Sequence, residues 1–543
     1  MLAFSKNIDI IISMNEENWH KQVIKGTEYV YIDHPYWDKE KKRGAHRRVY
    51  IGKMIEGEFV PNQKYEELQR AEEAMVSEIS MQGCSRRFRG VTWLFWEIAE
   101  KTNMIADLRR VFPDDWREIL ALAFYLAHDQ GQVMYRYQHW ANRTWVPTEV
   151  QLTSQRISEL LGRIGEAQKM EYFRLQAARL SETEYLAFDT TSISSYSRLL
   201  SQVRYGKNKE HDPLPQINLA TLYGSVSHLP VYFRKLPGNV PDVKTIQVLL
   251  NTIPFLRDCQ FRLVMDRGFY SIQNVNDMLL HRCKFLIGVP ISRKIVQAQL
   301  EQVRGDFVHR KYYDGSSHLY MRTFRIVWEF DRPRPRKKDF VREKKRVYLH
   351  VYYNEQGAAD ARRELNSRLD TYEEELRSNC RRADHEKAYA RYFTTRTVRG
   401  GNTHIICDEA AIEREMRDAG YFALLSNGIS SAQEAIQIYQ TRDLIEKCFE
   451  DLKDRLSMRR MAVSSEENFD GKLFVQFIGL QLLSYIQVKM EEADMFRTHS
   501  LQRVLDELDD IEYFEHPGRK GYFSEVLKKQ SDLYAMLDIP SPT

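Results

Sequence analysis

The chain has 543 residues, of which 43% are hydrophobic and 12% are aromatic. This length favours roughly three or four domains, and this composition excludes a wholly disordered protein. The 80 basic and 76 acidic side chains leave a net charge of only +4, so the charge of each region is more informative than the total.

No two of the six cysteines form a CxxC pair. This argues against a zinc site or a disulfide framework and favours a reducing compartment. The first 20 residues contain a short apolar run that Asp9 interrupts, and they lack a basic leader, so no signal peptide is predicted. No run approaches the roughly 20 apolar residues that a membrane span needs. We therefore expect a soluble cytoplasmic protein.

Residues 27–37 and 49–60 alternate apolar and polar side chains, as strands do. Residues 1–63 are therefore predicted to form a basic β-hairpin region. The cations near the tip of this hairpin are Lys39, Lys41, Lys42, Arg43, Arg47 and Arg48. Contact with a DNA backbone and simple solvation are equal alternatives for them.

Helical periodicity dominates residues 64–182, with the clearest helices expected over 91–112 and 114–129. A further helix begins near Thr153 and Ser154, which are both good N-cap residues. The region is predicted to bind DNA ends as a small helical module. A helical region that only packs is an equally good interpretation.

Short runs rich in β-branched and aromatic residues follow at 185–193, 217–224, 229–236, 259–269 and 283–291. Helix-period segments, 243–253 and 271–282, fall among them. Three consecutive strands, then a helix, a strand, a helix and a strand, indicate a mixed α/β sheet over 183–299.

Residues 300–428 break this pattern and are predicted to be an insertion. They contain strand-like runs, a charged helical run, and a basic run from Arg332 to Arg346 for which DNA contact and solvation are again equal alternatives. Residues 429–490 resume with a helix whose N-cap is Ser430 or Ser431, followed by an apolar, buried helix. Residues 491–543 are predicted to be a C-terminal helical region.

The stretch 438–456 has the pattern of a charged helix with one apolar stripe. At about 100° per residue, Tyr439, Arg442, Glu446 and Lys453 fall within roughly 60° of each other beside that stripe. A carboxylate there would be partly desolvated, with cations one or two turns away. On spacing alone, a solvated face with i,i+4 ion pairs is the commoner interpretation.

Asp189 and Asp266 each end an apolar strand run. A charge at the end of a buried strand is costly unless it is paired or binds a metal, although an Asp there can also cap a loop. Together with Glu446 these residues would form a site of three carboxylates, which can hold two Mg²⁺ ions through oxygen atoms. Such a site is typical of phosphoryl transfer on nucleic acid.

The spacing Y-x2-R-x3-E-x6-K within 438–456 resembles the Tyr-Arg-Glu-Lys signature of a large group of bacterial insertion-sequence transposases of the Asp-Asp-Glu class. FDTTS around Asp189 and MDRGFYS around Asp266 resemble the segments that carry the first and second aspartates of that family. The resemblance covers about 183–490. It implies an RNase H-like catalytic domain of the retroviral integrase superfamily, with a β-rich insertion and a mainly helical N-terminal region.

The same resemblance implies roles for individual residues. The implied catalytic ligands of two Mg²⁺ ions, which Mn²⁺ can replace, are Asp189, Asp266 and Glu446. The residues implied to bind DNA phosphates near the cut are Tyr439, Arg442 and Lys453. Trp328, in the insertion, would stack on a flipped base, although core packing is the commoner role of such a residue.

The implied activity is Mg²⁺-dependent cleavage at the terminal inverted repeats of an insertion sequence, followed by transfer of the 3′ ends into target DNA. The implied partners are double-stranded DNA and a second copy of the chain in a synaptic complex, at the nucleoid in the bacterial cytoplasm and without a membrane. One alternative is a catalytically silent, domesticated DNA-binding protein, and another is an RNase H-like nuclease that cuts without joining.

Overall fold

The structure is a computed structural model that divides into two compact units, described separately below. The smaller unit comprises residues 1–89, 511–526 and 542–543, and the larger comprises 90–510 and 527–541. The residues that the structure describes are 19–38, 43–55, 57–63, 65–67, 85–128, 133–180, 184–195, 200–206, 214–252, 262–334, 339–397, 403–442, 456, 465–516 and 520–543.

In the smaller unit, a four-stranded antiparallel sheet confirms the predicted hairpin and adds a strand on each side of it. Its strands are β1 (Trp19–Ile24), β2 (Thr27–Asp38), β3 (Arg43–Ile55) and β4 (Glu58–Pro61). Lys25 and Gly26 both have positive φ, 49° and 85°, as the central residues of a tight β-hairpin turn require. Val30, Ile32 and Ile51 form a fully buried core on one face of the sheet.

A second, three-stranded sheet of this unit joins distant parts of the chain. Its strands are β5 (Ser85–Phe88), β17 (Glu512–Glu515) and β18 (Tyr522–Phe523). Tyr513 pairs with Arg87, and the guanidinium of Arg89 lies 4.1 Å from the ring centre of Tyr513. Residues 512–523 were expected to be helical. They contain strands because their partner strand lies far away in the sequence, where local pattern cannot reveal it.

The larger unit begins with a group of helices, as the periodicity of 64–182 predicts. They are α3 (Gly90–Lys101), α4 (Met104–Val111), α5 (Trp116–His128), the 3₁₀ turn η2 (Met134–Arg136), α6 (Tyr137–Ala141), α7 (Ser154–Arg163) and α8 (Glu166–Ala177). The single helix expected over 91–112 is broken at Asn103, whose φ of 59° is left-handed. Thr153 is the N-cap of α7, since its hydroxyl accepts a hydrogen bond from the backbone of Arg156.

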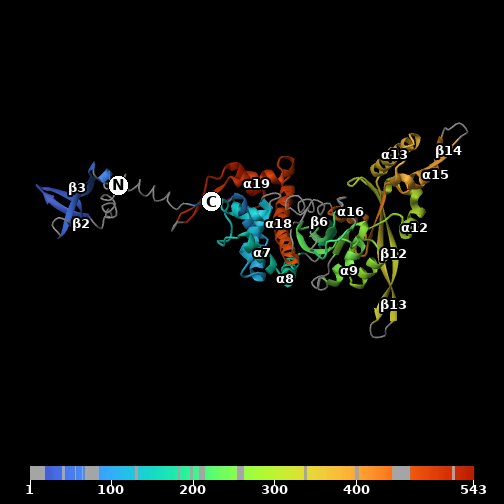
Figure 1. Cartoon of the computed structure of the whole chain (residues 1–543), viewed down its shortest axis with the longest axis horizontal. Coiled ribbons are helices and arrows are strands. Elements are labelled where there is room, and N and C mark those ends of the chain that lie inside the picture. The colour runs from blue at the N-terminus through green and yellow to red at the C-terminus, as the bar shows by residue number, and fades with distance from the viewer. Residues whose placement is uncertain are drawn as a thin grey trace. The chain divides into compact units, whose positions relative to one another are not determined.

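The apolar helix α18 (Glu466–Glu492) forms the centre of this helical group, and Figure 1 shows it beside α7. Phe474 packs on Phe112 of the helical region, with ring centres 5.4 Å apart, and Phe477 lies 5.2 Å from Phe233 of the sheet. By length and composition alone α18 could cross a membrane, which the sequence analysis did not expect. However, 83% of its most apolar window is buried inside the protein, as in a core helix.

A nine-stranded mixed sheet follows, in the order β11-β12-β13-β16-β10-β9-β6-β7-β8. Its first five strands in the chain are β6 (Tyr185–Ser194), β7 (Gln216–Gly224), β8 (Pro230–Pro237), β9 (Arg262–Met265) and β10 (Lys284–Val289). The helices and 3₁₀ turns of this part are α9 (Asp242–Thr252), η3 (Arg267–Phe269), α11 (Ile272–Leu280), α12 (Lys294–Val303), η4 (Arg304–Asp306) and η5 (Arg310–Tyr312). All five strands and both helices predicted over 183–299 are confirmed.

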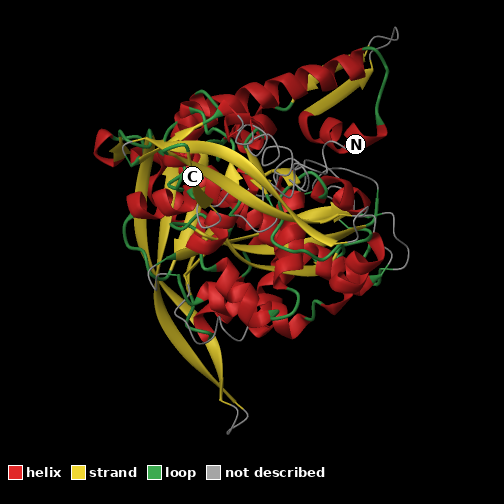
Figure 2. Ribbon diagram, turned by 90° about the vertical axis from the view of Figure 1, so that its left-hand side faces the viewer, coloured by secondary structure: helices red, strands yellow, loops and turns green. Residues whose placement is uncertain are grey.

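Four strands of the insertion extend this sheet, and residues 393–397 and 403–407 pair as a separate two-stranded sheet. The four strands that extend the nine-stranded sheet are β11 (Tyr313–Asp314), β12 (Leu319–Arg334), β13 (Asp339–Tyr353) and β16 (Tyr421–Ser426). β16 pairs antiparallel with both β10 and β13, so it fastens the insertion to the core. β12 and β13 form a long projecting ribbon, which Figures 1 and 2 both show.

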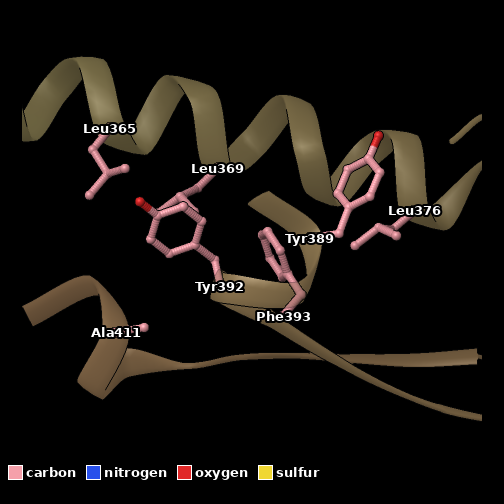
Figure 3. Packing of buried hydrophobic residues seen from close by; sticks show 7 residues of the cluster. All are labelled: Leu365, Leu369, Leu376, Tyr389, Tyr392, Phe393 and Ala411. Atoms are coloured by element: carbon pink, nitrogen blue, oxygen red, sulfur yellow. The ribbon is translucent and has the colours of Figure 1, made fainter. Parts of the chain in front are cut away.

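A small apolar cluster holds the rest of the insertion together. Its elements are α13 (Glu355–Arg377), η6 (Ala383–His385), α14 (Glu386–Tyr392), β14 (Phe393–Thr397), β15 (Thr403–Cys407) and α15 (Glu409–Met416). Leu365 and Leu369 of α13 face Tyr392 and Phe393 (Figure 3). This burial explains why so highly charged a helix as α13 is stable here.

A buried ion-pair network joins β8 to α18. The ammonium of Lys235 lies 2.6 Å from Glu466 and 2.5 Å from Asp470, and only 8% of the Lys235 side chain is exposed. Burial raises the pKa of Glu466, but hydrogen bonds from Lys235 and Ser201 outweigh it and hold this pKa below its ordinary value. The charges of Glu466 and Asp470 are therefore compensated by the ammonium of Lys235.

We predict that Lys235→Met lowers the free energy of unfolding by about 2 kcal/mol, because two partly buried carboxylates lose their cation. Urea denaturation followed by tryptophan fluorescence measures this loss. The control is Arg497→Ala, which removes an exposed ion pair with Asp494 and should cost less than about 0.5 kcal/mol. Equal losses in the two variants would contradict the prediction.

Candidate active site

The first two predicted catalytic residues follow matched positions on neighbouring parallel strands. β6 and β9 pair in register, with Ala187 opposite Val264 and Phe188 opposite Met265. Asp189 and Asp266 are the next residues along each strand, and Asp266 keeps an extended backbone with φ −72° and ψ 165°. Since neighbouring strands lie about 4.8 Å apart, the sheet brings the two aspartates side by side.

Asp189 is nearly buried, with 9% of its surface exposed. Its Oδ1 accepts a hydrogen bond of 2.7 Å from the backbone N–H of Thr190, and its backbone lies opposite Thr221 of β7. A carboxylate in such surroundings needs hydrogen bonds or a cation to offset its lost hydration. Its position fits the metal-ligand role expected from the sequence.

Asp266 ends β9 and begins the turn η3, and 36% of its side chain is exposed. Two residues of the predicted signature reach the same carboxylate oxygen. The phenol of Tyr439 donates a hydrogen bond of 3.0 Å to Oδ1, and Nη1 of Arg442 lies 3.0 Å from it. The structure therefore brings Tyr439, Arg442 and Asp266 together.

Tyr439 keeps its proton in this setting. Burial, and then the negative charge of Asp266, raise the pKa of Tyr439 far above its ordinary value. The phenol is thus protonated near neutral pH and can donate a hydrogen bond to Asp266. The guanidinium of Arg442 also lies 5.3 Å from the centre of the Tyr439 ring, a cation–π distance that fixes the two side chains relative to each other.

The helix that carries Tyr439 is shorter than the sequence predicts. α16 (Ala432–Gln440) begins at the predicted N-cap Ser431, whose hydroxyl accepts from the backbone of Glu434, but it ends at Gln440. The hydroxyl of Thr441 donates to the carbonyl of Ile438, a local bond that competes with continued helix. One continuous helix through 438–456 is therefore wrong. Glu446 and Lys453 lie outside the described residues.

The described part of the site fits a hard divalent cation. Asp189 and Asp266 offer carboxylate oxygens, the ligands that Mg²⁺ prefers. Within the described ranges, no group of three or more His, Cys, Asp or Glu side chains could hold a metal ion. The predicted third ligand, Glu446, is not among those residues, so Asp189 and Asp266 form the two described members of the proposed set.

Trp328 lies in β12 and is 8% exposed. Its indole N–H donates a hydrogen bond of 2.8 Å to the side chain of Asn276 in α11. In this structure the residue thus anchors the projecting ribbon to the core, as the packing interpretation expects. Base stacking by Trp328 stays a prediction, since it requires the ring to leave this contact.

The predicted basic segments are partly neutralised in the described part of the chain. On the ribbon, Arg332 pairs with Glu343, and Glu329 pairs with both Arg342 and Lys344. In the N-terminal hairpin, Arg48 lies over the ring of Tyr31 at 5.1 Å. The tip cations Lys39, Lys41 and Lys42 lie outside the described residues. DNA contact and solvation stay alternatives for both segments.

Two polar residues near the aspartates were not identified from the sequence. Asp242 accepts a hydrogen bond from the hydroxyl of Thr190, and Asn274 donates to the carbonyl of Phe269, three residues after Asp266, and to that of Val243. An acidic residue in the first turn of a helix is common, so Asp242 carried no distinctive signal. The structure also corrects the prediction that Asp189 ends a strand, because β6 continues through Thr190 as far as Ser194.

Comparison with known proteins identifies the family of the chain. A family model described as "Transposase DDE domain" matches residues 181–482. No curated protein matches the chain. Among solved structures, the piggyBac transposase synaptic complex with hairpin DNA is similar at 12% identity, covering 77% of this chain and 75% of that chain with a TM-score of 0.32. Since the family match spans more than half of the 543 residues, the chain belongs to the transposase DDE domain family, which has an RNase H-like fold and whose chemistry is phosphoryl transfer.

Proposed function

We propose that this protein is a cut-and-paste transposase of a bacterial insertion sequence. It cleaves DNA at the terminal inverted repeats of its element and joins the 3′ ends to target DNA. The observation that supports this best is the pair of aspartates on β6 and β9, together with the contact of Tyr439 and Arg442 with Asp266. Residues of one predicted signature thus converge on a predicted metal ligand.

The proposed metal ligands are Asp189, Asp266 and Glu446. DDE transposases generally use divalent metal ions. Two Mg²⁺ ions, or Mn²⁺ in their place, would activate a water or a 3′-hydroxyl and stabilise the leaving oxygen. The β6–β9 pairing places Asp189 and Asp266 at neighbouring positions, one residue beyond the last pair of the ladder.

Tyr439, Arg442 and Lys453 are proposed to hold phosphates near the cut, since cations and a hydroxyl suit that role. In the structure, Tyr439 and Arg442 both contact Oδ1 of Asp266, so the two side chains lie at the proposed metal-ligand carboxylate. Trp328 is proposed as the stacking partner of a flipped base.

The proposed partners are double-stranded DNA, as element ends and as target, and a second copy of the chain. Two element ends must be cut in concert, so a homodimer in a synaptic complex is the expected active form. The proposed location is the bacterial cytoplasm, at the nucleoid.

We predict that Glu446→Gln lowers the rate of DNA cleavage by about 1,000-fold or more and leaves DNA binding unchanged, because a neutral amide is a poor Mg²⁺ ligand. The purified chain is incubated with Mg²⁺ and a duplex carrying the ends that flank its gene. Cleaved and joined products are separated on a denaturing gel. The matched control is Glu434→Gln, an exposed glutamate of α16 that should cut normally.

Each outcome of this assay bears on the proposal. Cutting at the element boundary by the wild type and Glu434→Gln, but not by Glu446→Gln, supports it. Normal cutting by Glu446→Gln contradicts the assignment of the third carboxylate. Binding without cutting by all three proteins favours the silent DNA-binding alternative, and cutting without joined products favours the nuclease.

We also predict that Tyr439→Phe slows cleavage about 10-fold and Arg442→Ala about 100-fold, since each removes a hydrogen bond to a charged group. Single-turnover cleavage measures both effects. If Arg442 also holds a phosphate, Arg442→Ala reduces by about one the slope of log K against log salt for DNA binding. Arg414→Ala, an exposed arginine of α15, is the control. Wild-type cleavage by Arg442→Ala would exclude it from the site.

A further inference from the structure

The pairing of β6 with β9 does not by itself fix the position of Asp266 relative to Asp189. The last paired residues of the two strands are Phe188 and Met265, one residue before the two aspartates. β6 continues beyond this point, but β9 ends there and Asp266 begins a turn. Ladder hydrogen bonds therefore do not hold Asp266 against Asp189. Because metal ligation needs carboxylates within a few tenths of an ångström, other groups must fix the turn.

Asp242 contacts the strand on the side of the first aspartate. Its Oδ1 accepts a hydrogen bond of 2.6 Å from the hydroxyl of Thr190. Thr190 is only 2% exposed, and its backbone N–H donates to Oδ1 of Asp189 at 2.7 Å. The carboxylate of Asp242 therefore holds the residue that itself hydrogen-bonds the first predicted ligand.

Asn274 contacts the turn on the side of the second aspartate. It lies in α11 and is 1% exposed. Its amide donates two hydrogen bonds of 2.7 Å, one to the carbonyl of Phe269 and one to the carbonyl of Val243. Phe269 closes the turn that Asp266 begins, through a bond of 3.1 Å from its N–H to the Asp266 carbonyl. Val243 directly follows Asp242 in the chain.

These contacts form one continuous path between the two aspartates. It runs from Asp189 through Thr190 to the start of α9, and from there through Asn274 to the turn that begins at Asp266. The turn also passes close to Asp242, since a side-chain carbon at Gly268 would lie 3.8 Å from Oδ2 of Asp242. Both ends of the path reach a predicted metal ligand.

We propose that Asp242 and Asn274 are positioning residues, which hold the carboxylates of Asp189 and Asp266 at the separation that a divalent metal requires. This inference rests on the proposed function, because it takes the two aspartates as metal ligands. Asp242 acts through Thr190 and does not bind the metal itself. Its Oδ1 is engaged by the Thr190 hydroxyl, and no group of three acidic side chains suitable for a metal occurs within the described ranges.

A positioning role and a ligand role predict different effects of conservative change. Asparagine keeps a side-chain oxygen that can accept from the Thr190 hydroxyl, whereas alanine does not. Asp242→Asn should therefore retain most metal binding, and Asp242→Ala should not. Thr190→Val removes the donor and should match Asp242→Ala. In a double-mutant cycle, the double variant should be no worse than either single variant.

The test measures Mn²⁺ binding to the full-length chain by the loss of the free-ion signal in electron paramagnetic resonance, together with single-turnover cleavage of duplex element ends. We expect Asp242→Ala, Thr190→Val and Asn274→Ala to weaken Mn²⁺ binding by about 10- to 100-fold. Asp242→Asn should stay within about 3-fold of the wild type. Excess Mn²⁺ should restore part of the cleavage rate of Asp242→Ala.

Asp277→Ala is the matched control. Asp277 also links α9 to α11, since its Oδ2 accepts a hydrogen bond of 3.1 Å from Gln247, and its Oδ1 accepts one from Gln273, which is not part of the path between the aspartates. This variant should bind Mn²⁺ as the wild type does. Thermal unfolding of every variant shows which ones fold. Should Asn274→Ala fail to fold, Asp242→Asn and Thr190→Val still decide the question.

Three results would overturn the proposal. Wild-type Mn²⁺ binding by a folded Asp242→Ala would show that the path does not position the ligands. Equal losses in Asp242→Asn and Asp242→Ala would make Asp242 a ligand instead. Equal losses in Asp277→Ala would indicate general disturbance of the helices. If the wild type binds Mn²⁺ but cuts no DNA, the proposed function fails, while the Mn²⁺ titrations still test the positioning role.

Discussion

The in-register parallel pairing of β6 and β9 is the constraint on which the site depends. A ladder fixes which residues lie opposite one another, and a slip by one residue would turn each side chain to the other face. The pairing of Phe188 with Met265 thereby places Asp189 and Asp266 at matched positions, one residue beyond this pair. β7 and β8 extend the sheet on one side, and β10 and β16 extend it on the other, so β6 and β9 are interior strands that cannot shift independently.

Electrostatic repulsion between the two aspartates explains why residues at the end of α16, far away in the sequence, contact one of them. Two neighbouring carboxylates repel each other unless cations or donors offset their charge. At Asp266, Arg442 provides a positive charge and Tyr439 donates a hydrogen bond from its phenol. The other aspartate, Asp189, accepts a hydrogen bond from the backbone N–H of Thr190.

Sequence patterns predicted the elements whose signal is local. The five strands over 183–299 and the N-caps Thr153 and Ser431 are examples, because periodicity and capping chemistry depend only on neighbouring residues. The strands β17 and β18 and the end of α16 were mispredicted, since pairing with β5 and a side-chain bond of Thr441 decide them. Within the site, Asp189, Asp266, Tyr439 and Arg442 came from motif spacing. Asp242 and Asn274 could not be predicted in this way, because their role depends on the contacts that α9 and α11 make with β6 and the turn η3.

The hydrogen bond between Tyr439 and Asp266 joins residues 173 positions apart in the chain. The whole insertion lies between them, so a ribosome must synthesise β12, β13 and the α13 cluster before the second aspartate can meet its partners. Closing so long a loop costs only slightly more entropy than closing a short one, because this cost grows with the logarithm of loop length. The long separation therefore affects when the contact forms during synthesis more than how stable it is. A nascent chain carries both aspartates before it carries Tyr439 and Arg442. The contact between Asp266 and Tyr439 thus forms only after synthesis has proceeded at least as far as Tyr439.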